Sequence, residues 1–247
     1  MKGRLNIDLG ELPDEPEELY GLAHLVNLAC GGHAGDGESV RRAVDLALRH
    51  GATVTAHPSY PDRDNFGRRS LAIEAPALEE SIRQQCALLA SVARAAGLRV
   101  DHLKPHGALY HDAWSRPAVA RALLDGAAAG LGLLSSELWI LGSPGLASPE
   151  TASRSPEPAS PGTATLSVGG ESFVVAGLLA EAFADRAYDA AGGLVPRGQP
   201  GALLSDPQDC ARQALALQAT GRFQTFCVHG DSPGAVVIAR AVRAALA

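Results

Sequence analysis

Residues 5–11, LNIDLGE, and residues 26–36, VNLACGGHAGD, carry the pattern that decides the fold. Each string opens with a short apolar run of strand character and ends in acidic, histidine or glycine residues. A stretch at 37–51, GESVRRAVDLALRHG, follows, with apolar residues at helical spacing and a closing glycine. A strand, a polar turn and a helix in this order are typical of a βα unit around a parallel sheet.

The same alternation continues along the chain and predicts an α/β fold. A longer helix is expected from Pro76 to Gly97, and another begins after the Asp206-Pro207 pair, where aspartate caps and proline occupies the first turn. The expected strands are 4–8, 25–29, 53–57, 100–104, 137–141, 173–178 and 224–228.

One segment breaks this rhythm. Residues 143–165 are rich in Pro, Ser, Ala and Thr and show no hydrophobic period, so we expect a flexible surface loop there. A strand-like run, SFVVAGLLAEAF, resumes at residue 172. We therefore expect a single domain over residues 1–247.

Composition excludes some classes of partner. The formal net charge is −6 and the arginines are scattered, which argues against a nucleic-acid partner. The first residues lack the apolar run of a signal peptide, and no run is long enough for a membrane span, so we expect a cytoplasmic protein. The four cysteines form no CxxC pair, which indicates buried small residues and not a zinc knuckle or disulfide framework.

Polar residues follow nearly every predicted strand. Taken singly, each is most simply a helix cap or a turn former. In parallel α/β folds, however, the carboxyl ends of the strands gather at one edge, where ligands bind, so the recurrence predicts one shared site. The residues are Asp8, Glu11, His33, Asp36, His57, Asp62, Arg68, Arg69, His102, Lys104, His106, Tyr110, Glu181, Asp185, Arg186, His229 and Asp231.

This inventory suits hydrolytic chemistry. Carboxylates activate water, imidazoles relay protons, and Lys104 can offset the charge of an oxyanion or instead form a salt bridge with a site carboxylate. The same groups can bind a divalent metal, for which Asp8, His33 and His57 are the candidates, although no HExxH pair is present. Neither a GxxxxGK[ST] loop nor a GxGxxG turn occurs, so nucleotide chemistry would need an unfamiliar site or another protein of a complex.

Seven strings in order resemble the LamB/YcsF family, from about Leu5 to Asp231. They are NxDLGE from Asn6, NLACGGHAGD from Asn27, AHPSYPDRDNFGRR from Ala56, HLKPHGALY from His102, FADRAY from Phe183, GGLVPR from Gly192 and CVHGD from Cys227. Gly32 departs from the pattern, because the family usually has an aromatic residue there, and this predicts a more open pocket wall.

The resemblance implies a (β/α) barrel of seven strands, irregular and similar to the glycoside hydrolase and deacetylase group. It implies hydrolysis of 5-oxo-L-proline to L-glutamate coupled to ATP hydrolysis, with partner subunits B and C and with ATP used by the whole complex. The family's polar positions fall on Asp8, His33, Asp36, His57, Asp62, Lys104, His106, Asp185, Arg186, His229 and Asp231.

With Glu11 and Arg68 added from the strand-end pattern, the predicted site has two parts. The catalytic set is Asp8, Glu11, His33, Asp36, His57, Lys104 and His106, and the substrate-binding set is Asp62, Arg68, Asp185, Arg186, His229 and Asp231. Two alternatives stay open. One is a metal-dependent amide or acetyl hydrolase that needs no ATP, and the other is a substrate-binding subunit whose partners perform the catalysis.

Overall fold

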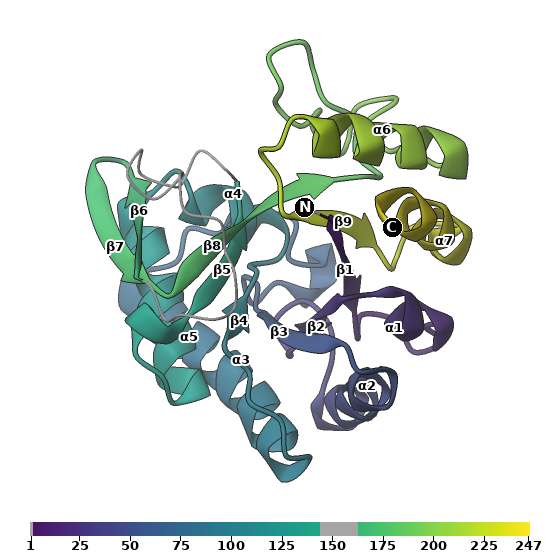
Figure 1. Cartoon of the computed structure of the whole chain (residues 1–247). Helices are drawn as coiled ribbons and strands as arrows, with labels where there is room; N and C mark the ends of the chain where they lie inside the picture. The colour runs from purple at the N-terminus through teal and green to yellow at the C-terminus, as the bar shows by residue number, and fades with distance from the viewer. Residues whose placement is uncertain (1, 144–162) are drawn as a thin grey trace.

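Seven parallel strands close into a barrel in the computed structural model, which describes residues 2–143 and 163–247 (Figure 1). The strands pair in the order β1-β2-β3-β4-β5-β8-β9, and β9 pairs with β1 to close the ring. The seven-stranded α/β barrel expected from the sequence is confirmed. Its strands are β1 (Arg4–Leu9), β2 (Leu25–Ala29), β3 (Thr53–His57), β4 (His102–Leu103), β5 (Trp139–Gly142), β8 (Gly177–Phe183) and β9 (Thr225–His229).

Helices surround the barrel and connect most successive strands (Figure 1). Local signals fix their ends: the Asp36 side chain accepts the N–H groups of Glu38 and Ser39 at the start of α2, and Gly51, with φ 68°, ends it. The helices are α1 (Glu18–Leu22), α2 (Gly37–His50), α3 (Ala75–Ala95), α4 (Gly107–Ala113), α5 (Pro117–Leu131), α6 (Pro207–Ala219) and α7 (Ala235–Leu246), with short 3₁₀ turns η1 (Arg63–Asn65) and η2 (Ser135–Glu137).

The prediction of one barrel strand at 173–178 is wrong. An antiparallel hairpin, β6 (Ala164–Val168) and β7 (Glu171–Val175), occupies this region, and the sixth barrel strand begins only at Gly177. The apolar run at 172–183 continues through the connection between β7 and β8, so the sequence gives no sign of a turn there. A Cβ on Gly177 would lie 2.2 Å from the Trp139 ring, so glycine is what lets β8 start beside β5.

Two other boundaries also differ from expectation. The strand expected at 100–104 pairs only over His102–Leu103. The Lys104 N–H still donates to the Ala56 carbonyl of β3 at 2.9 Å, but Pro105, which follows, has no N–H to continue the ladder. The loop expected at 143–165 ends earlier, since β6 starts at Ala164. Its remainder, 144–162, lies outside the described residues.

Among the described residues, the buried apolar side chains form three clusters, the third being Tyr110, Phe183 and Cys227. The largest cluster fills the space between the outer faces of the strands and the helices, and includes Ile7, Val44 and Ile238. A separate small cluster of Leu25, Leu141 and Leu179, with Trp139 against it, lies inside the barrel near the amino-terminal ends of the strands. This apolar floor leaves the carboxyl ends of the strands to polar side chains.

Helices α3 and α5 pack closely because α5 carries two glycines one turn apart. A Cβ on Gly126 would lie 2.5 Å from the carbonyl oxygen of Glu79, and a Cβ on Gly130 would lie 2.4 Å from that of Arg83. Real Cβ atoms do not approach backbone oxygen so closely, so a larger residue at either position would push the helices apart.

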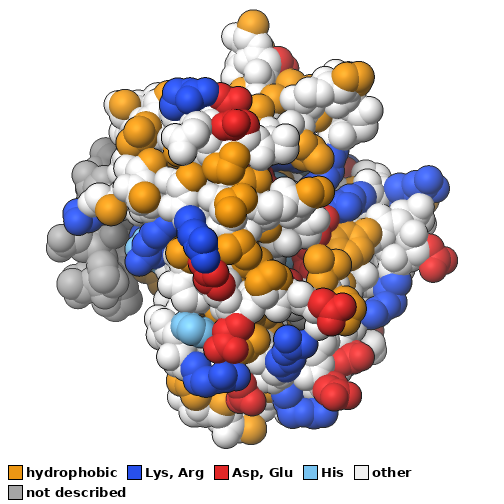
Figure 2. Space-filling view, turned by 90° about the vertical axis from the view of Figure 1, so that its right-hand side faces the viewer, with side chains coloured by type: hydrophobic (Ala, Val, Ile, Leu, Met, Phe, Trp, Pro, Cys, Tyr) orange, Lys and Arg blue, Asp and Glu red, His pale blue; other side chains and the backbone are white. Residues whose placement is uncertain are grey.

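The outer surface over α1, α2 and α7 mixes both signs of charge (Figure 2). The Arg240 side chain on α7 pairs with Glu18 on α1, and Arg49 on α2 lies 3.2 Å from Glu17. In the part of the chain that the structure describes, no helix is long and apolar enough to cross a membrane. All four cysteines are free and buried, as expected from their spacing.

Candidate active site

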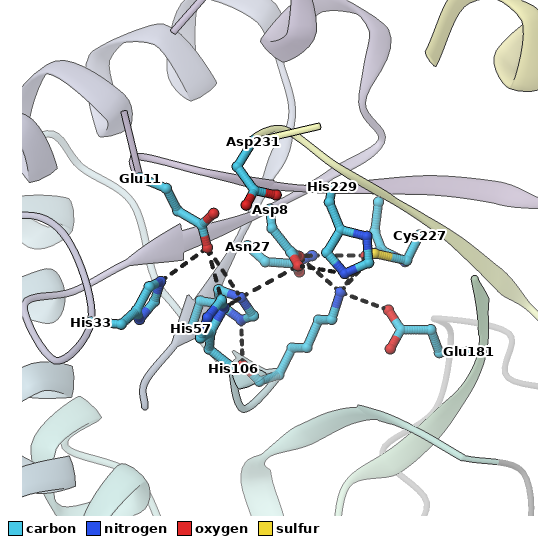
Figure 3. Close-up of polar contacts among 12 residues, drawn as sticks. Asp8, Glu11, Asn27, His33, His57, His106, Glu181, Cys227, His229 and Asp231 are labelled. Atoms are coloured by element: carbon cyan, nitrogen blue, oxygen red, sulfur yellow. Dashed lines mark hydrogen bonds and ion pairs between the residues drawn. The ribbon is translucent and has the colours of Figure 1, made fainter. Parts of the chain in front are cut away.

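Polar side chains converge at the carboxyl ends of the strands, above the apolar floor (Figure 3). The two-residue alternation of β1 puts Asn6 and Asp8 on one face. The parallel register then sets Asp8 level with Asn27 of β2 and with His229 of β9. His57 ends β3 on the same side of the ring.

Lys104 lies at the centre of this polar layer and is 2% exposed. Its Nζ is 2.8 Å from Asp8 Oδ1, 3.0 Å from Glu181 Oε1 and 3.0 Å from Cys227 Sγ. It also donates to Asn6 Oδ1 at 3.2 Å. The salt bridge considered from the sequence therefore forms, and it links residues that are far apart in the chain.

The ammonium group separates the pKa values of its two carboxylate partners. Burial alone would raise the pKa of Asp8, but Lys104 and His57 outweigh it and hold that pKa well below its ordinary value. Burial raises the pKa of Glu181, and Lys104 only partly offsets this. Asp8 is therefore the ionised carboxylate of the layer, whereas Glu181 is the one that takes up a proton more readily.

A second cluster gathers three imidazoles around Glu11 (Figure 3). Glu11 Oε1 lies 2.9 Å from His33 Nε2, 3.2 Å from His106 Nδ1 and 3.8 Å from His57 Nε2. His57 Nε2 is also 3.5 Å from Asp8 Oδ2, which joins this cluster to the lysine layer. The ligand atoms of the four residues lie within 4.8 Å of one another, so the group can hold a metal ion.

Burial controls the protonation of this cluster. It would raise the pKa of Glu11, but the interactions with the His106 and His33 rings outweigh it and hold the pKa well below the ordinary value. Burial, with help from the nearby His106, lowers the pKa of His33 to about 4. Glu11 is thus ionised at neutral pH, and His33 is a neutral ring.

The turn that carries Glu11 is held by Glu15. The Glu15 carboxylate accepts the backbone N–H of Gly10 at 2.8 Å and that of Glu11 at 3.4 Å, and Tyr20 Oη donates to it at 2.8 Å. Glu15 is a functional residue that sequence reasoning missed, because it belongs to no strand end.

Asp185 fixes the orientation of His229. Its carboxylate accepts the backbone N–H of His229 at 2.9 Å and the ring Nδ1–H at 2.9 Å. The opposite nitrogen, Nε2, is then 3.9 Å from Asp8 Oδ2. Burial would lower the pKa of His229, but Asp185 outweighs it and raises that pKa.

A cavity of about 490 Å³ opens above these groups. Its inner wall includes Asp8, His57, Lys104, His106 and His229. Three arginines and two rings line the outer part: Arg68, Arg186, Arg197, Tyr110 and Phe183. A cavity of this size suits a small molecule, and the arginines suit an anionic group on it.

The arginines of the cavity are held by polar partners. Asp231 pairs with Arg68 and lies 3.4 Å from Arg197, so one carboxylate orients two guanidinium groups. Arg186 donates to the carbonyl oxygen of Val195 at 2.8 Å. Arg197 was not among the predicted site residues, although it ends the quoted string GGLVPR.

Six of the thirteen predicted site residues do not line the cavity: Glu11, His33, Asp36, Asp62, Asp185 and Asp231. Asp36 is exposed and caps α2, where its carboxylate is engaged by backbone N–H groups. Asp62 precedes η1 and accepts a hydrogen bond from Asn65 at 2.8 Å. Glu11 and His33 contact the His106 ring, and Asp185 contacts the His229 ring, on the sides that face away from the cavity. Glu181 was expected after its strand but lies within β8.

Several site residues were missed because they lie within the strands. Asn27 donates to both Asn6 and Asp8 at 2.7 Å, and Cys227 contacts Lys104. The available signal was the two-residue alternation, since Asn6 and Cys227 precede Asp8 and His229 by two positions.

The opening expected beside Gly32 is filled. A Cβ at this position would lie 2.4 Å from both Gln85 Oε1 and Ser59 Oγ. Gln85 is buried, accepts the Ser59 N–H at 3.0 Å and donates to the Ser59 carbonyl at 3.0 Å. Glutamine and serine thus take the space that a side chain at position 32 would need.

Comparisons with known proteins agree with the sequence pattern. The model of the LamB/YcsF family matches residues 4–247. The chain is 38% identical to the 5-oxoprolinase A-subunit 3 of Pseudomonas aeruginosa, covering 98% of this chain and 95% of that protein. It is 36% identical to the 5-oxoprolinase A-subunit of Streptomyces avermitilis, covering 98% and 94%.

A solved structure shares the fold over the whole chain. It is the crystal structure of the lactam utilization protein from Thermus thermophilus, which is 33% identical with a TM-score of 0.79. The match covers 100% of this chain and 96% of that one. The barrel fold is thus shared with a solved structure over the whole chain.

Proposed function

The chain belongs to the LamB/YcsF family, and from this we propose that it is the A-subunit of an ATP-dependent 5-oxoprolinase, which hydrolyses 5-oxo-L-proline to L-glutamate in the cytoplasm. One observation carries the proposal. Curated relatives from two bacteria bear the name of the 5-oxoprolinase A-subunit, and the match covers nearly the full length of both chains. The name of the Thermus thermophilus protein, which refers to lactam utilization, supports the same substrate class.

The reaction needs a base, an oxyanion partner and an acid. The oxygen of water bonds to the lactam carbonyl carbon, the ring C–N bond breaks, and the nitrogen takes a proton to become the amine of glutamate. Asp8 is ionised and lies at the inner wall of the cavity, so its carboxylate is available to accept the proton of water. His229 Nε2 lies 3.9 Å from Asp8 Oδ2 and can take that proton on to the departing nitrogen.

The other groups have matching roles. Lys104 places a buried positive charge beside the reacting carbonyl, where an oxyanion develops. His229 has a raised pKa and is held by Asp185, so it is suited to protonate the departing nitrogen. The substrate carboxylate is expected to bind the arginines of the cavity, chiefly Arg186 and Arg197.

ATP use is assigned to the complex and not to this chain alone. A lactam is a stable amide, and transfer of the γ-phosphoryl group of ATP to its carbonyl oxygen creates a better electrophile and releases ADP. Water then attacks the carbonyl carbon, and the ring C–N bond breaks to leave γ-glutamyl phosphate. A second water hydrolyses this acyl phosphate to glutamate and inorganic phosphate. The sequence carries no recognised phosphate loop, so we assign nucleotide binding to partner subunits B and C.

A hydrolase that acts on an amide or acetyl group without ATP is the second candidate. The observation that favours it is the group formed by Glu11, His33, His57 and His106, whose ligand atoms suit a metal ion. A purely substrate-binding role is disfavoured, because a low-pKa carboxylate and an anchored imidazole face the same cavity.

The deciding experiment is glutamate release from 5-oxoproline, with and without ATP, by this chain alone and with subunits B and C. We expect release only when ATP and both partners are present. Release by the chain alone without ATP would favour the second candidate. Full release by B and C without this chain would refute a catalytic role for it.

A further inference from the structure

Two histidines of the site each turn one ring nitrogen toward the other. His57 Nδ1 lies 2.7 Å from the carbonyl oxygen of Lys104, and His106 Nε2 lies 3.0 Å from that of Phe66. A carbonyl oxygen only accepts hydrogen bonds, so both of these ring nitrogens carry their proton. When both rings are neutral, the remaining nitrogens, His57 Nε2 and His106 Nδ1, hold lone pairs, and they are 3.0 Å apart. Such a pair needs a cation between the two atoms.

Glu11 supplies a third donor at the same point. Its Oε1 is 3.2 Å from His106 Nδ1 and 3.8 Å from His57 Nε2. The centre of the triangle formed by the three atoms is about 2.0 Å from each of them, which matches zinc–nitrogen and zinc–oxygen bond lengths. The ring planes of His57 and His106 are at 89°, so one ion can lie near both planes.

His33 does not fit as a ligand of the same ion. Its ring stacks on that of His106, with centroids 3.6 Å apart and planes at 3°. Parallel stacked rings cannot both hold one ion in their planes. His33 instead donates its Nε2–H to Glu11 at 2.9 Å, as partners behind a metal ligand commonly do.

We propose that His57 Nε2, His106 Nδ1 and Glu11 Oε1 bind one divalent transition-metal ion, with Zn²⁺ as the reference case. Two imidazoles and one carboxylate favour such an ion over Mg²⁺ or Ca²⁺. The site retains His57 from the sequence-based candidates and replaces Asp8 and His33 by His106 and Glu11. His57 and His106 line the cavity, so the open side of the ion faces it. An ion there would act as a Lewis acid or activate water.

The backbone at Phe66 and Gly67 positions the His106 ring. Phe66, whose carbonyl binds His106, has a φ of 54° and is the one non-glycine residue with positive φ among those described. A Cβ on the adjacent Gly67 would lie 3.0 Å from His33 Cβ and 3.2 Å from His106 Cδ2. A left-handed residue thus aims the carbonyl, and a glycine makes room for the stacked rings.

The charge balance also calls for a cation. The Lys104 ammonium is already shared by Asp8 and Glu181. In the ion pairs of the described residues, Glu11 is paired only with histidines. Its buried carboxylate therefore lacks a permanent positive partner, which a divalent ion would supply.

Zinc binding by the full chain tests the proposal without substrate or partner proteins, so its result is independent of the lactam reaction. After chelator treatment, the folded chain should bind one equivalent of Zn²⁺ in calorimetry, and Co²⁺ should give a visible absorption band. Glu11→Gln and His106→Gln should each weaken binding about 100-fold. His111→Gln, which changes an exposed histidine of the same cavity, should leave it unchanged.

A measurement on the wild-type chain keeps the proposal testable if the variants fail to fold. In ¹⁵N spectra of the imidazoles, Zn²⁺ should shift His57 Nε2 and His106 Nδ1 while the opposite nitrogens stay protonated. A folded wild-type chain that takes up no Zn²⁺ and shows an imidazolium signal from this pair would mean that a shared proton is the cation. That result, or unchanged affinity in both ligand variants, would overturn the proposal.

Discussion

The ammonium group of Lys104 lies 2.8 Å from the carboxylate of Asp8 inside the barrel, although β1 and β4, which carry them to this point, are not neighbours in the ring. Glu181 of β8 approaches the same ammonium to 3.0 Å. The ion pair thus connects three parts of the closed sheet. Its strength depends on all partners being present, because none of them is open to solvent.

Loss of the lysine should therefore cost much stability. Lys104→Met leaves the buried Asp8 carboxylate without its main partner, and we expect the free energy of unfolding at pH 7 to fall by about 3–5 kcal/mol. Urea unfolding followed by circular dichroism measures it. The double variant Lys104→Met/Asp8→Asn should recover part of the loss. A single-variant loss below about 1 kcal/mol would mean that the pair contributes little.

Asp8 and Asp36 should respond differently to the same change. Asp8→Asn removes the ionised carboxylate of the cavity and should lower glutamate release by the assembled complex about 100-fold or more. Asp36→Asn preserves a capping side chain on α2, because asparagine caps as well as aspartate, and should keep the wild-type rate. Equal losses in both variants would restore Asp36 to the catalytic set predicted from the sequence.

The α3–α5 contact should be sensitive to one added methyl group. Gly130→Ala places a Cβ 2.4 Å from the Arg83 carbonyl oxygen. We expect overpacking to lower the free energy of unfolding by about 1–3 kcal/mol. Gly198→Ala is the matched control, since a Cβ there meets no heavy atom within 4 Å. Similar unfolding midpoints for the two variants would show that the helices move apart at no cost.

Acid should weaken the fold through His24, far from the cavity. Burial and the nearby Arg243 and Arg4 lower the pKa of His24 to about 4, and its Nδ1 accepts the Leu5 N–H at 2.8 Å. The unfolded chain binds this proton at about pH 6.5, so the stability from neutral His24 is complete above that pH. It should be lost as the pH falls from 6.5 to 4.

The ring is only partly buried, so we expect an effect of about 1 kcal/mol, smaller than the full pKa difference implies. The check is the free energy of unfolding of the wild type and of His24→Asn between pH 7 and pH 4. The variant should show a shallower decline across this range. Parallel pH profiles would mean that His24 stays neutral in both states or is protonated in both.

Much of the fold was accessible from the sequence because most barrel strands are short apolar runs bounded by turns. The expected strands at 25–29 and 53–57 match β2 and β3 residue for residue. The hairpin β6–β7 was missed although its Gly169-Gly170 turn is a recognised hairpin signal, because its second strand and β8 form one apolar run. Only the close packing of Gly177 against Trp139 separates them, and this contact exists only in the folded barrel.

The site was predictable as a set of strand-end residues but not in its detail. Asp36 sits in a motif yet turns to cap a helix, an interpretation that its place before the run at 37–51 already allowed. Asn6 and Cys227 lie below the strand ends, where side chains normally form core. Which histidine nitrogen carries the proton depends on carbonyls from distant turns, such as that of Phe66, and no local pattern encodes this.

The closure of β9 onto β1 also governs when the molecule can become functional during synthesis. The side chain of Asn6 donates to Thr225 Oγ1, 219 positions away, and Asp8 faces a histidine from the same last strand. A nascent chain still lacking β9 has an open sheet with two exposed edges and an incomplete cavity. The barrel and its cavity can therefore be completed only after nearly the whole chain has been synthesised.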